Sequence, residues 1–282
     1  MPNASCLCGG VAWQAEEPLE LMTHCHCSMC RKAHGVAFAT YVAVAAPRFR
    51  WLHGEDQVAR FESSPGFHRP FCSRCGSVVA EDPGDDERVF MPAGCLDDDT
   101  GARAVAHIFA SSKAPWHEIV DALPRFDAYQ PGFDAPKVPE RDAPPDDGRI
   151  HGSCLCGAVA YALSQEPKLI INCHCSRCRK ARAAAHASNL FAEKATFVWL
   201  RGEDELIRFK LPDAERFTHV FCRSCGSSCP RVAEDATHVV IPAGGLDDDP
   251  GARERFHIFT ASKAAWYDLP DDGLPRFEES AG

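Results

Sequence analysis

The sequence lacks the features that mark membrane-spanning, nucleic-acid-binding and secreted proteins. No apolar run approaches about 18 residues, so no segment is long enough to cross a bilayer as a helix. Only 30 Lys and Arg stand against 40 Asp and Glu, and the formal charge of −10 provides no chain-wide basic field for phosphate backbones or anionic lipid. Residues 1–20 contain neither a basic cluster nor an apolar core. We therefore read no secretory signal and expect a cytoplasmic protein.

Helical periodicity is also scarce, and short strand-like segments dominate. These segments are rich in β-branched or aromatic residues and are bounded by Gly, Pro or Asp. They occupy residues 37–44, 47–54, 57–63, 88–94, 188–194, 196–202, 206–211, 218–222 and 238–244. The best helical candidates are single turns after Cys30 and Cys178. The sequence predicts a mainly β protein.

The chain repeats itself. The matched blocks, in the same order in both copies, are SCLCGGVAW (5–13) with SCLCGAVAY (153–161), CHCSMCRKA (25–33) with CHCSRCRKA (173–181), FRWLHGED (49–56) with FVWLRGED (197–204), FCSRCGS (71–77) with FCRSCGS (221–227), PAGCLDDDTGAR (92–103) with PAGGLDDDPGAR (242–253), HIFASSKAPW (107–116) with HIFTASKAAW (257–266), and LPRF (123–126) with LPRF (274–277). This order predicts a tandem duplication of one small domain, with copies at 1–128 and 149–282.

The segment 129–148 between the copies is rich in proline and has no apolar periodicity. Its prolines are Pro131, Pro136, Pro139, Pro144 and Pro145. This composition predicts an extended linker. The alternative is a strap that packs across one domain, anchored by Tyr129 and Phe133.

Cysteine is abundant, with 16 residues that divide into eight per copy. In a reducing compartment, metal ligation is favoured over disulfides. Seven cysteines of each copy have a counterpart in the other, whereas Cys95 faces Gly245 and Cys229 faces Val79. Seven equals four plus three, which matches one closed structural zinc site and one zinc site with an open position. We expect Cys95 to be a free structural thiol.

The spacing suggests which cysteines share an ion. The CxxC pair followed by Gly is typical of a zinc knuckle, which joins a second two-ligand element. We predict closed sites at Cys6, Cys8, Cys72 and Cys75 and at Cys154, Cys156, Cys222 and Cys225. The open sites are then Cys25, Cys27 and Cys30 and Cys173, Cys175 and Cys178. The alternative joins the knuckle to part of the Cys25–Cys30 run. The expected cofactor is Zn²⁺, about two ions per domain and four per chain.

A histidine could complete the three-cysteine sites, which would make all ions structural. His26 and His174 lie between two ligands, where a side chain more often points away. His24 is replaced by Asn172 in the second copy and cannot be a shared ligand. His186, which replaces Phe38, could close or serve the second site only.

These motifs together resemble the glutathione-dependent formaldehyde-activating enzyme family, which includes the centromere protein V type of domain. The resemblance rests on SCLCGGV, CHCSMCRKAHG, FCSRCGS, PAGCLDD and HIFASSKAPW…LPRF, with their second-copy matches. It implies an Mss4-like zinc-binding fold, a structural zinc on the CxC and CxxC pairs, and a catalytic zinc on CxCxxC. It also implies condensation of formaldehyde with glutathione, the co-substrate, to S-hydroxymethylglutathione.

The resemblance leads to a functional prediction. We expect a carbon–sulfur lyase-type enzyme that handles a small-molecule thiol and a small aldehyde, binds no nucleic acid or membrane, and has two domains able to dock as a pseudo-dimer. The basic pairs that follow the triplets are candidates to hold a carboxylate of the thiol, or form a solvated face: Arg31, Lys32, Arg179 and Lys180. Because Gly35, Phe38 and Tyr41 become Ala183, His186 and Asn189, the second copy is expected to be inactive or altered in substrate. The alternative is a non-catalytic, zinc-stabilised binding module for a protein partner.

Overall fold

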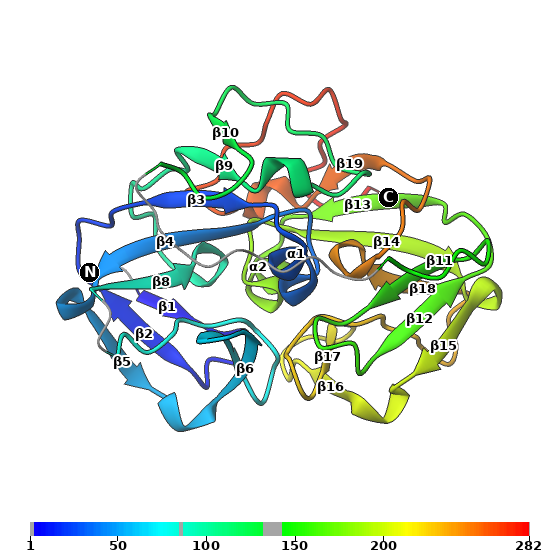
Figure 1. The fold of residues 1–282 in the computed structure, drawn as a ribbon, viewed down its shortest axis with the longest axis horizontal. Helices are drawn as coiled ribbons and strands as arrows, with labels where there is room; N and C mark the ends of the chain where they lie inside the picture. The colour runs from blue at the N-terminus through cyan, green and yellow to red at the C-terminus, as the bar shows by residue number, and fades with distance from the viewer. Residues whose placement is uncertain (1–2, 85–86, 132–142, 282) are drawn as a thin grey trace.

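The computed structural model describes residues 3–84, 87–131 and 143–281, which form two similar halves lying side by side (Figure 1). We call residues 3–131 the first half and residues 143–281 the second half. The short helices α1 (Ser28–His34) and α2 (Ser176–Arg182) lie between the halves (Figure 1). Strands and short 3₁₀ turns supply the other regular structure. The prediction of a mainly β, duplicated fold is confirmed.

The first half contains a five-stranded sheet ordered β10-β9-β3-β4-β8, a three-stranded sheet ordered β1-β2-β5, and the hairpin β6-β7. The strands are β1 (Asn3–Ser5), β2 (Ala12–Ala15), β3 (Met22–Cys25), β4 (Ala39–Ala45), β5 (Phe49–His53), β6 (Val58–Ser64), β7 (Phe67–Cys72), β8 (Arg88–Pro92), β9 (Ala106–Ile108) and β10 (Arg125–Phe126). All pairings are antiparallel except those of β9 with β3 and β10.

The second half repeats this arrangement with a four-stranded sheet ordered β18-β14-β13-β19, a three-stranded sheet ordered β11-β12-β15, and the hairpin β16-β17. The strands are β11 (Ile150–Ser153), β12 (Ala160–Leu163), β13 (Leu169–Cys173), β14 (Ala187–Glu193), β15 (Phe197–Arg201), β16 (Leu206–Lys210), β17 (Thr218–Cys222), β18 (His238–Pro242) and β19 (Glu254–Ile258). A single bridge between His257 and Arg276 occupies the place of β10.

The two helices differ from the sequence expectation, because they begin before Cys30 and Cys178 rather than after them. The reason is local. The sulfur of Cys27 accepts the N–H of Cys30 at 3.4 Å and so caps the helix, a role that Ser or Asp usually fills. Cys175 caps α2 in the same way. The residue that caps each helix is therefore a cysteine of the three-cysteine group in the same half.

Each helix packs against the other half, at a 3₁₀ turn that follows an edge strand. Helix α1 contacts the turn Ala243–Gly245, and α2 contacts the turn Ala93–Cys95. Beside α1, the buried ammonium of Lys32 donates to Ser153 O, Ser153 Oγ and Gly245 O at 2.8–3.0 Å and pairs with Asp247 at 2.7 Å. The long-range contacts therefore fix how the halves meet.

The Lys32 cluster makes a stability prediction. Because the Lys32 side chain is only 2% exposed, Lys32→Met leaves Asp247 and two carbonyls without their buried cation. We expect a loss of about 3 kcal/mol in the free energy of unfolding, measured by denaturant titration. Lys168→Met removes an exposed ion pair with Glu193 and serves as the control, with an expected loss below about 1 kcal/mol. Equal losses in the two variants would contradict the assignment.

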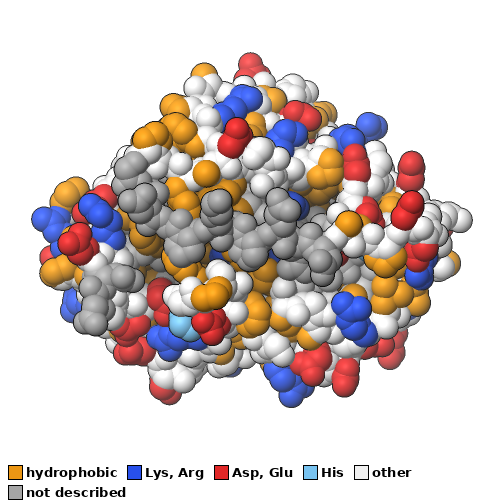
Figure 2. All heavy atoms as spheres, viewed as in Figure 1, with side chains coloured by type: hydrophobic (Ala, Val, Ile, Leu, Met, Phe, Trp, Pro, Cys, Tyr) orange, Lys and Arg blue, Asp and Glu red, His pale blue; other side chains and the backbone are white. Residues whose placement is uncertain are grey.

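The predicted linker 129–148 is described only at its ends. Residues 132–142, including Phe133, lie outside the described residues. Tyr129 packs its ring edge-on against Phe109, with centroids 4.8 Å apart. Elsewhere on the face drawn in Figure 2, acidic and basic side chains are interspersed. Among the described residues, no helix is long and apolar enough to cross a membrane.

Candidate metal centres

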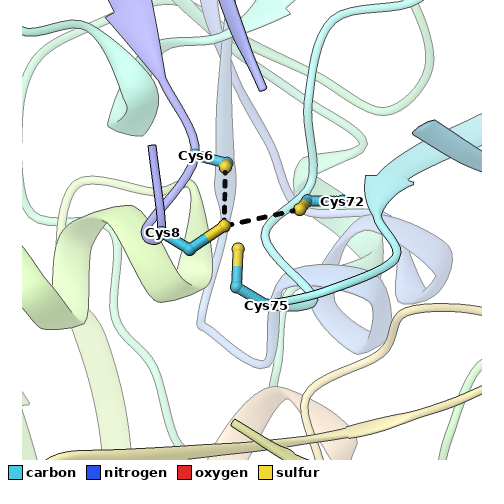
Figure 3. Close-up of side chains that lie close together, drawn as sticks. All are labelled: Cys6, Cys8, Cys72 and Cys75. Atoms are coloured by element: carbon cyan, nitrogen blue, oxygen red, sulfur yellow. Dashed lines mark hydrogen bonds between the residues drawn. The ribbon is translucent and has the colours of Figure 1, made fainter. Parts of the chain in front are cut away.

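Four cysteine sulfurs converge in each half. In the first half, Cys6 and Cys8 from the turn after β1 face Cys72, the last residue of β7, and Cys75 in the knuckle that follows (Figure 3). The sulfur of Cys8 lies 3.5 Å from that of Cys6 and 3.8 Å from that of Cys72. The second half gathers the equivalent atoms of Cys154, Cys156, Cys222 and Cys225, at 3.5 and 3.7 Å for the corresponding pairs. Either group could hold a metal ion.

The backbone of each loop shapes these groups. The N–H of Val11 donates to the Cys6 sulfur at 3.3 Å, and the knuckle turns at Gly76 with a φ of +75°. A Cβ on Gly76 would lie 2.4 Å from the ring of Phe221, which belongs to the other half. Gly226 meets Phe71 at the same distance. Glycine is required at both knuckles by the positive φ and by the packing between halves.

The crowded thiols perturb one another. Hydrogen bonds that Cys8 accepts from Cys6 and Cys72 lower its pKa to about 7, whereas donation to its neighbours raises the pKa of Cys6. Cys156 and Cys154 show the same pair of shifts. Four thiolates this close repel one another unless a cation lies among them. The electrostatics of these groups therefore favour a bound metal cation.

Two further groups contain three sulfurs each: Cys25, Cys27 and Cys30 in the first half, and Cys173, Cys175 and Cys178 in the second. The members of each group lie within 4.8 Å of one another. No His, Asp or Glu of the described residues joins either triplet. Each triplet could hold a metal ion with a position left over for another ligand.

The histidines beside the triplets form hydrogen-bonded relays. His26 Nε2 lies 2.8 Å from His107 Nδ1, and His107 Nε2 lies 3.0 Å from the carboxylate of Asp121. Because the carboxylate accepts, His107 donates from Nε2 and accepts at Nδ1, so His26 donates from Nε2. In the second half, His174, His257 and Asp272 repeat the relay with both contacts at 2.8 Å.

The structure also places the remaining histidines considered as ligands. His24 Nδ1 lies 2.8 Å from the hydroxyl of Thr40. The ring of His186 packs against His174, with centroids 5.0 Å apart. Neither histidine belongs to a sulfur group among the described residues.

Comparison with known proteins decides the family. The family model described as glutathione-dependent formaldehyde-activating enzyme (GFA) matches residues 1–112 and 149–262, one match in each half. The chain belongs to the GFA family. A Halomonas elongata protein named "Putative glutathione-dependent formaldehyde-activating enzyme" is 32% identical over 127 residues, which cover 42% of this chain and 80% of that protein. A Rhodobacter sphaeroides crystal structure matches 45% of this chain and 98% of its own, at 19% identity and a TM-score of 0.27.

In this GFA protein, three of the four basic residues beside the triplets make contacts between the halves. Lys32 makes the contacts described above. Lys180 pairs with Asp97 and bonds to Ser5 Oγ, and the buried Arg179 donates to the carbonyls of Gly94 and Leu96 at 3.0 and 2.8 Å. Arg31 is half-buried. The three named contacts join the halves and involve no atom of a triplet.

The unmatched cysteines are buried thiols. Cys95 donates to the carbonyl of Val78 at 3.4 Å, and Cys229 donates to that of Ser227 at 3.3 Å. Neither belongs to one of the four sulfur groups. Burial raises the pKa of Cys95 to about 12, which keeps it an unreactive thiol near neutral pH.

Sequence reasoning missed the basic residues that face the triplets. Arg69 on β7 donates from Nη1 to the Cys30 sulfur at 3.6 Å. Its counterpart in the second half is His219, so a comparison of the copies for shared basic residues passes over it. In the second half, the basic residues are Arg182, Arg216 and Arg231, which line a cavity with Cys178. The sequence difference that could have identified them is that the first copy has His34, Gly66 and Glu81 at the equivalent positions.

Proposed function

We propose that this GFA protein is a zinc-dependent, carbon–sulfur lyase-type enzyme that joins a glutathione-like thiol to a small aldehyde such as formaldehyde, or cleaves the adduct. The observation that carries the proposal is a cluster of three cysteines with no further protein ligand among the described residues, in a member of this family. Family membership supports the thiol and the aldehyde as substrates. We include cytoplasmic location in the proposal, since free thiols need a reducing compartment.

The donor sets fit zinc. For a Zn–S bond of about 2.3 Å, the edge of a tetrahedron of sulfurs is about 3.8 Å. Sulfur separations of 3.5–3.8 Å in the four-cysteine groups and 3.7 Å between Cys173 and Cys175 match this value. Soft thiolates prefer zinc to magnesium or calcium. We therefore assign two closed Cys₄ sites and two Cys₃ sites, four ions per chain.

The reaction needs a thiolate beside an aldehyde carbonyl. A zinc ion on three thiolates supplies an exchangeable position that holds a thiol and lowers its pKa. The thiol sulfur forms a bond to the carbonyl carbon, and the proton of the thiol ends on the carbonyl oxygen as a hydroxyl. The protein gains mainly by holding both reactants together. Around the triplets, the His26 and His174 relays fix the CxC loops, and the capping N–H groups of α1 and α2 orient Cys27 and Cys175.

We also propose that the two domains, 1–128 and 149–282, act as a docked pseudo-dimer joined by the linker 129–148. The reciprocal packing of α1 and α2 on the opposite half supports this arrangement. The triplet-bearing helices then depend on both domains for their position.

The reaction is tested by exchange spectroscopy. Protein, glutathione and formaldehyde are mixed, and the interconversion of free thiol and S-hydroxymethyl adduct is followed by NMR. We expect an exchange rate at least about tenfold above the spontaneous one, because proximity alone supplies several kcal/mol. The variants Cys27→Ser and Cys175→Ser assign the activity to one half or to both.

The control is Cys95→Ser, which alters a buried cysteine outside the four sulfur groups. We expect it to retain the exchange rate of the unaltered protein. A rate equal to the spontaneous one in the zinc-loaded protein would contradict the enzymatic proposal and favour the binding module.

A further inference from the structure

The two triplets differ in exposure. In the first half, Cys25, Cys27 and Cys30 are 6%, 2% and 5% exposed. In the second half, Cys173 is 5% exposed, whereas Cys175 and Cys178 are only partly buried. A substrate that must reach a sulfur-bound ion therefore meets a buried triplet in one half and a partly exposed one in the other.

Several side chains surround the first triplet, and two of them have no equivalent in the second half. Arg69 donates to the Cys30 sulfur, and Tyr129 packs with Tyr41 and Phe126 against the hydrophobic cluster that contains all three cysteines. The backbone pairing of Phe109 with Ala128, and of Phe259 with Glu279, makes Ser280 the counterpart of Tyr129. Ser280 is exposed, and His219 replaces Arg69, so the second triplet lacks both side chains.

A cavity of about 140 Å³ opens beside the second triplet. Cys178 lines it, together with Arg182, Arg216 and Arg231. Arg182 lies one helical turn after Cys178 on α2, so both side chains lie on the same face. His219 also lines the cavity, and its Nδ1 lies 2.7 Å from the carbonyl oxygen of Cys75. No carboxylate of the described residues lines this cavity.

None of the three arginines has an acidic partner among the described residues. Arg182 is only 9% exposed, and its buried Nη1 has no hydrogen-bond partner. Arg231 is half-exposed and Arg216 is exposed, and neither side chain has a hydrogen bond or ion pair among the described residues. Three unpaired guanidinium groups around one cavity repel one another and attract an anion. The first half has His34, Gly66 and Glu81 at these positions.

We propose that the second half is the one that takes substrate, and that Arg182 and Arg231 bind a carboxylate of the thiol while its sulfur lies beside Cys178. The proposal rests on the proposed function and deepens it. The cavity is smaller than the usual ligand pocket of about 300 Å³ or more, so it holds one end of a peptide-like thiol. The remainder extends past the exposed Arg216. The first triplet is a structural site.

The test is binding without aldehyde, measured by titration calorimetry on the zinc-loaded full chain. Glutathione is compared with glutathione diethyl ester, which keeps the thiol and lacks the carboxylates. We expect one glutathione per chain, bound about tenfold or more tighter than the ester. Arg182→Met and Arg231→Met are expected to remove this preference by weakening glutathione alone. Arg208→Met, which removes an exposed arginine outside the cavity, is expected to retain it.

Four results would overturn the inference: two glutathione molecules per chain, equal affinity for acid and ester, no binding at millimolar thiol, or an unchanged preference in Arg231→Met. Arg231 is half-exposed and its substitution is expected to leave folding intact, so this variant decides if Arg182→Met is unstable. Selective binding by a protein that shows no exchange with formaldehyde would instead contradict only the proposed reaction. The two failures are therefore distinguishable.

Discussion

Cys75→Ser is expected to remove one metal ion per chain and to lower the thermal midpoint by at least about 10 °C. Cys75 is fully buried in the knuckle after β7, and its sulfur is one of four that converge in the first half (Figure 3). Structural zinc contributes roughly 10–16 kcal/mol of apparent folding free energy in small zinc domains at neutral pH. Even part of that loss is a large fraction of the roughly 5–15 kcal/mol that stabilises an ordinary domain. Metal analysis and thermal unfolding followed by circular dichroism measure the two effects.

The matched control is Cys95→Ser, another fully buried cysteine of the same half that lies outside the sulfur groups. We expect it to keep all ions and to shift the midpoint far less. The substitution only replaces the sulfur that donates one weak hydrogen bond to Val78 O by a hydroxyl oxygen. If Cys75→Ser and Cys95→Ser lost the same amount of stability with unchanged metal content, the four-cysteine group would be mere core packing.

The duplication and the grouping of the cysteines are visible in the sequence because they depend on local spacing. Seven matched cysteines per copy divide into four and three, and the structure gathers the same sulfur atoms. The role of Lys32 depends instead on Ser153 and Asp247, residues 121 and 215 positions away, which no local pattern places beside it. A basic residue after a metal-binding turn therefore suggested a substrate contact, whereas its partners lie in the other half.

The difference between the two triplets was only half predictable. Substitutions beside the second triplet, such as Asn189 for Tyr41, suggested altered or lost activity in that copy. Our proposal makes the opposite assignment from the greater exposure of Cys175 and Cys178, and from Tyr129 and Ser280, which differ between the halves and lie beyond the last repeated motif. Both residues reach their places through the backbone pairing that follows the LPRF segments. This contact is tertiary, and no periodicity encodes it.

The second large effect is expected where the backbones of the two halves pack closely at Gly244. A Cβ on Gly244 would lie 2.3 Å from both the carbonyl oxygen of Arg31 and the N–H nitrogen of Val36 in the other half. Those atoms belong to backbone and cannot rotate away, so Gly244→Ala forces α1 and the Ala243–Gly245 turn apart. We expect a loss of at least about 3 kcal/mol in the free energy of unfolding. Denaturant titration measures the loss, and limited proteolysis measures the loosening of the halves.

Gly245→Ala isolates this effect, because it adds the same methyl group one residue along the same turn. Its Cβ would lie 3.1 Å from the hydroxyl of Tyr161, and the first half already carries a side chain, Cys95, at the equivalent position. We expect it to cost about 1 kcal/mol or less. Since α1 also presents Cys30, separation of the halves in Gly244→Ala should expose the first triplet and make its metal ion easier to remove with a chelator. Loss of stability without faster metal release would separate the docking of the halves from the burial of that triplet.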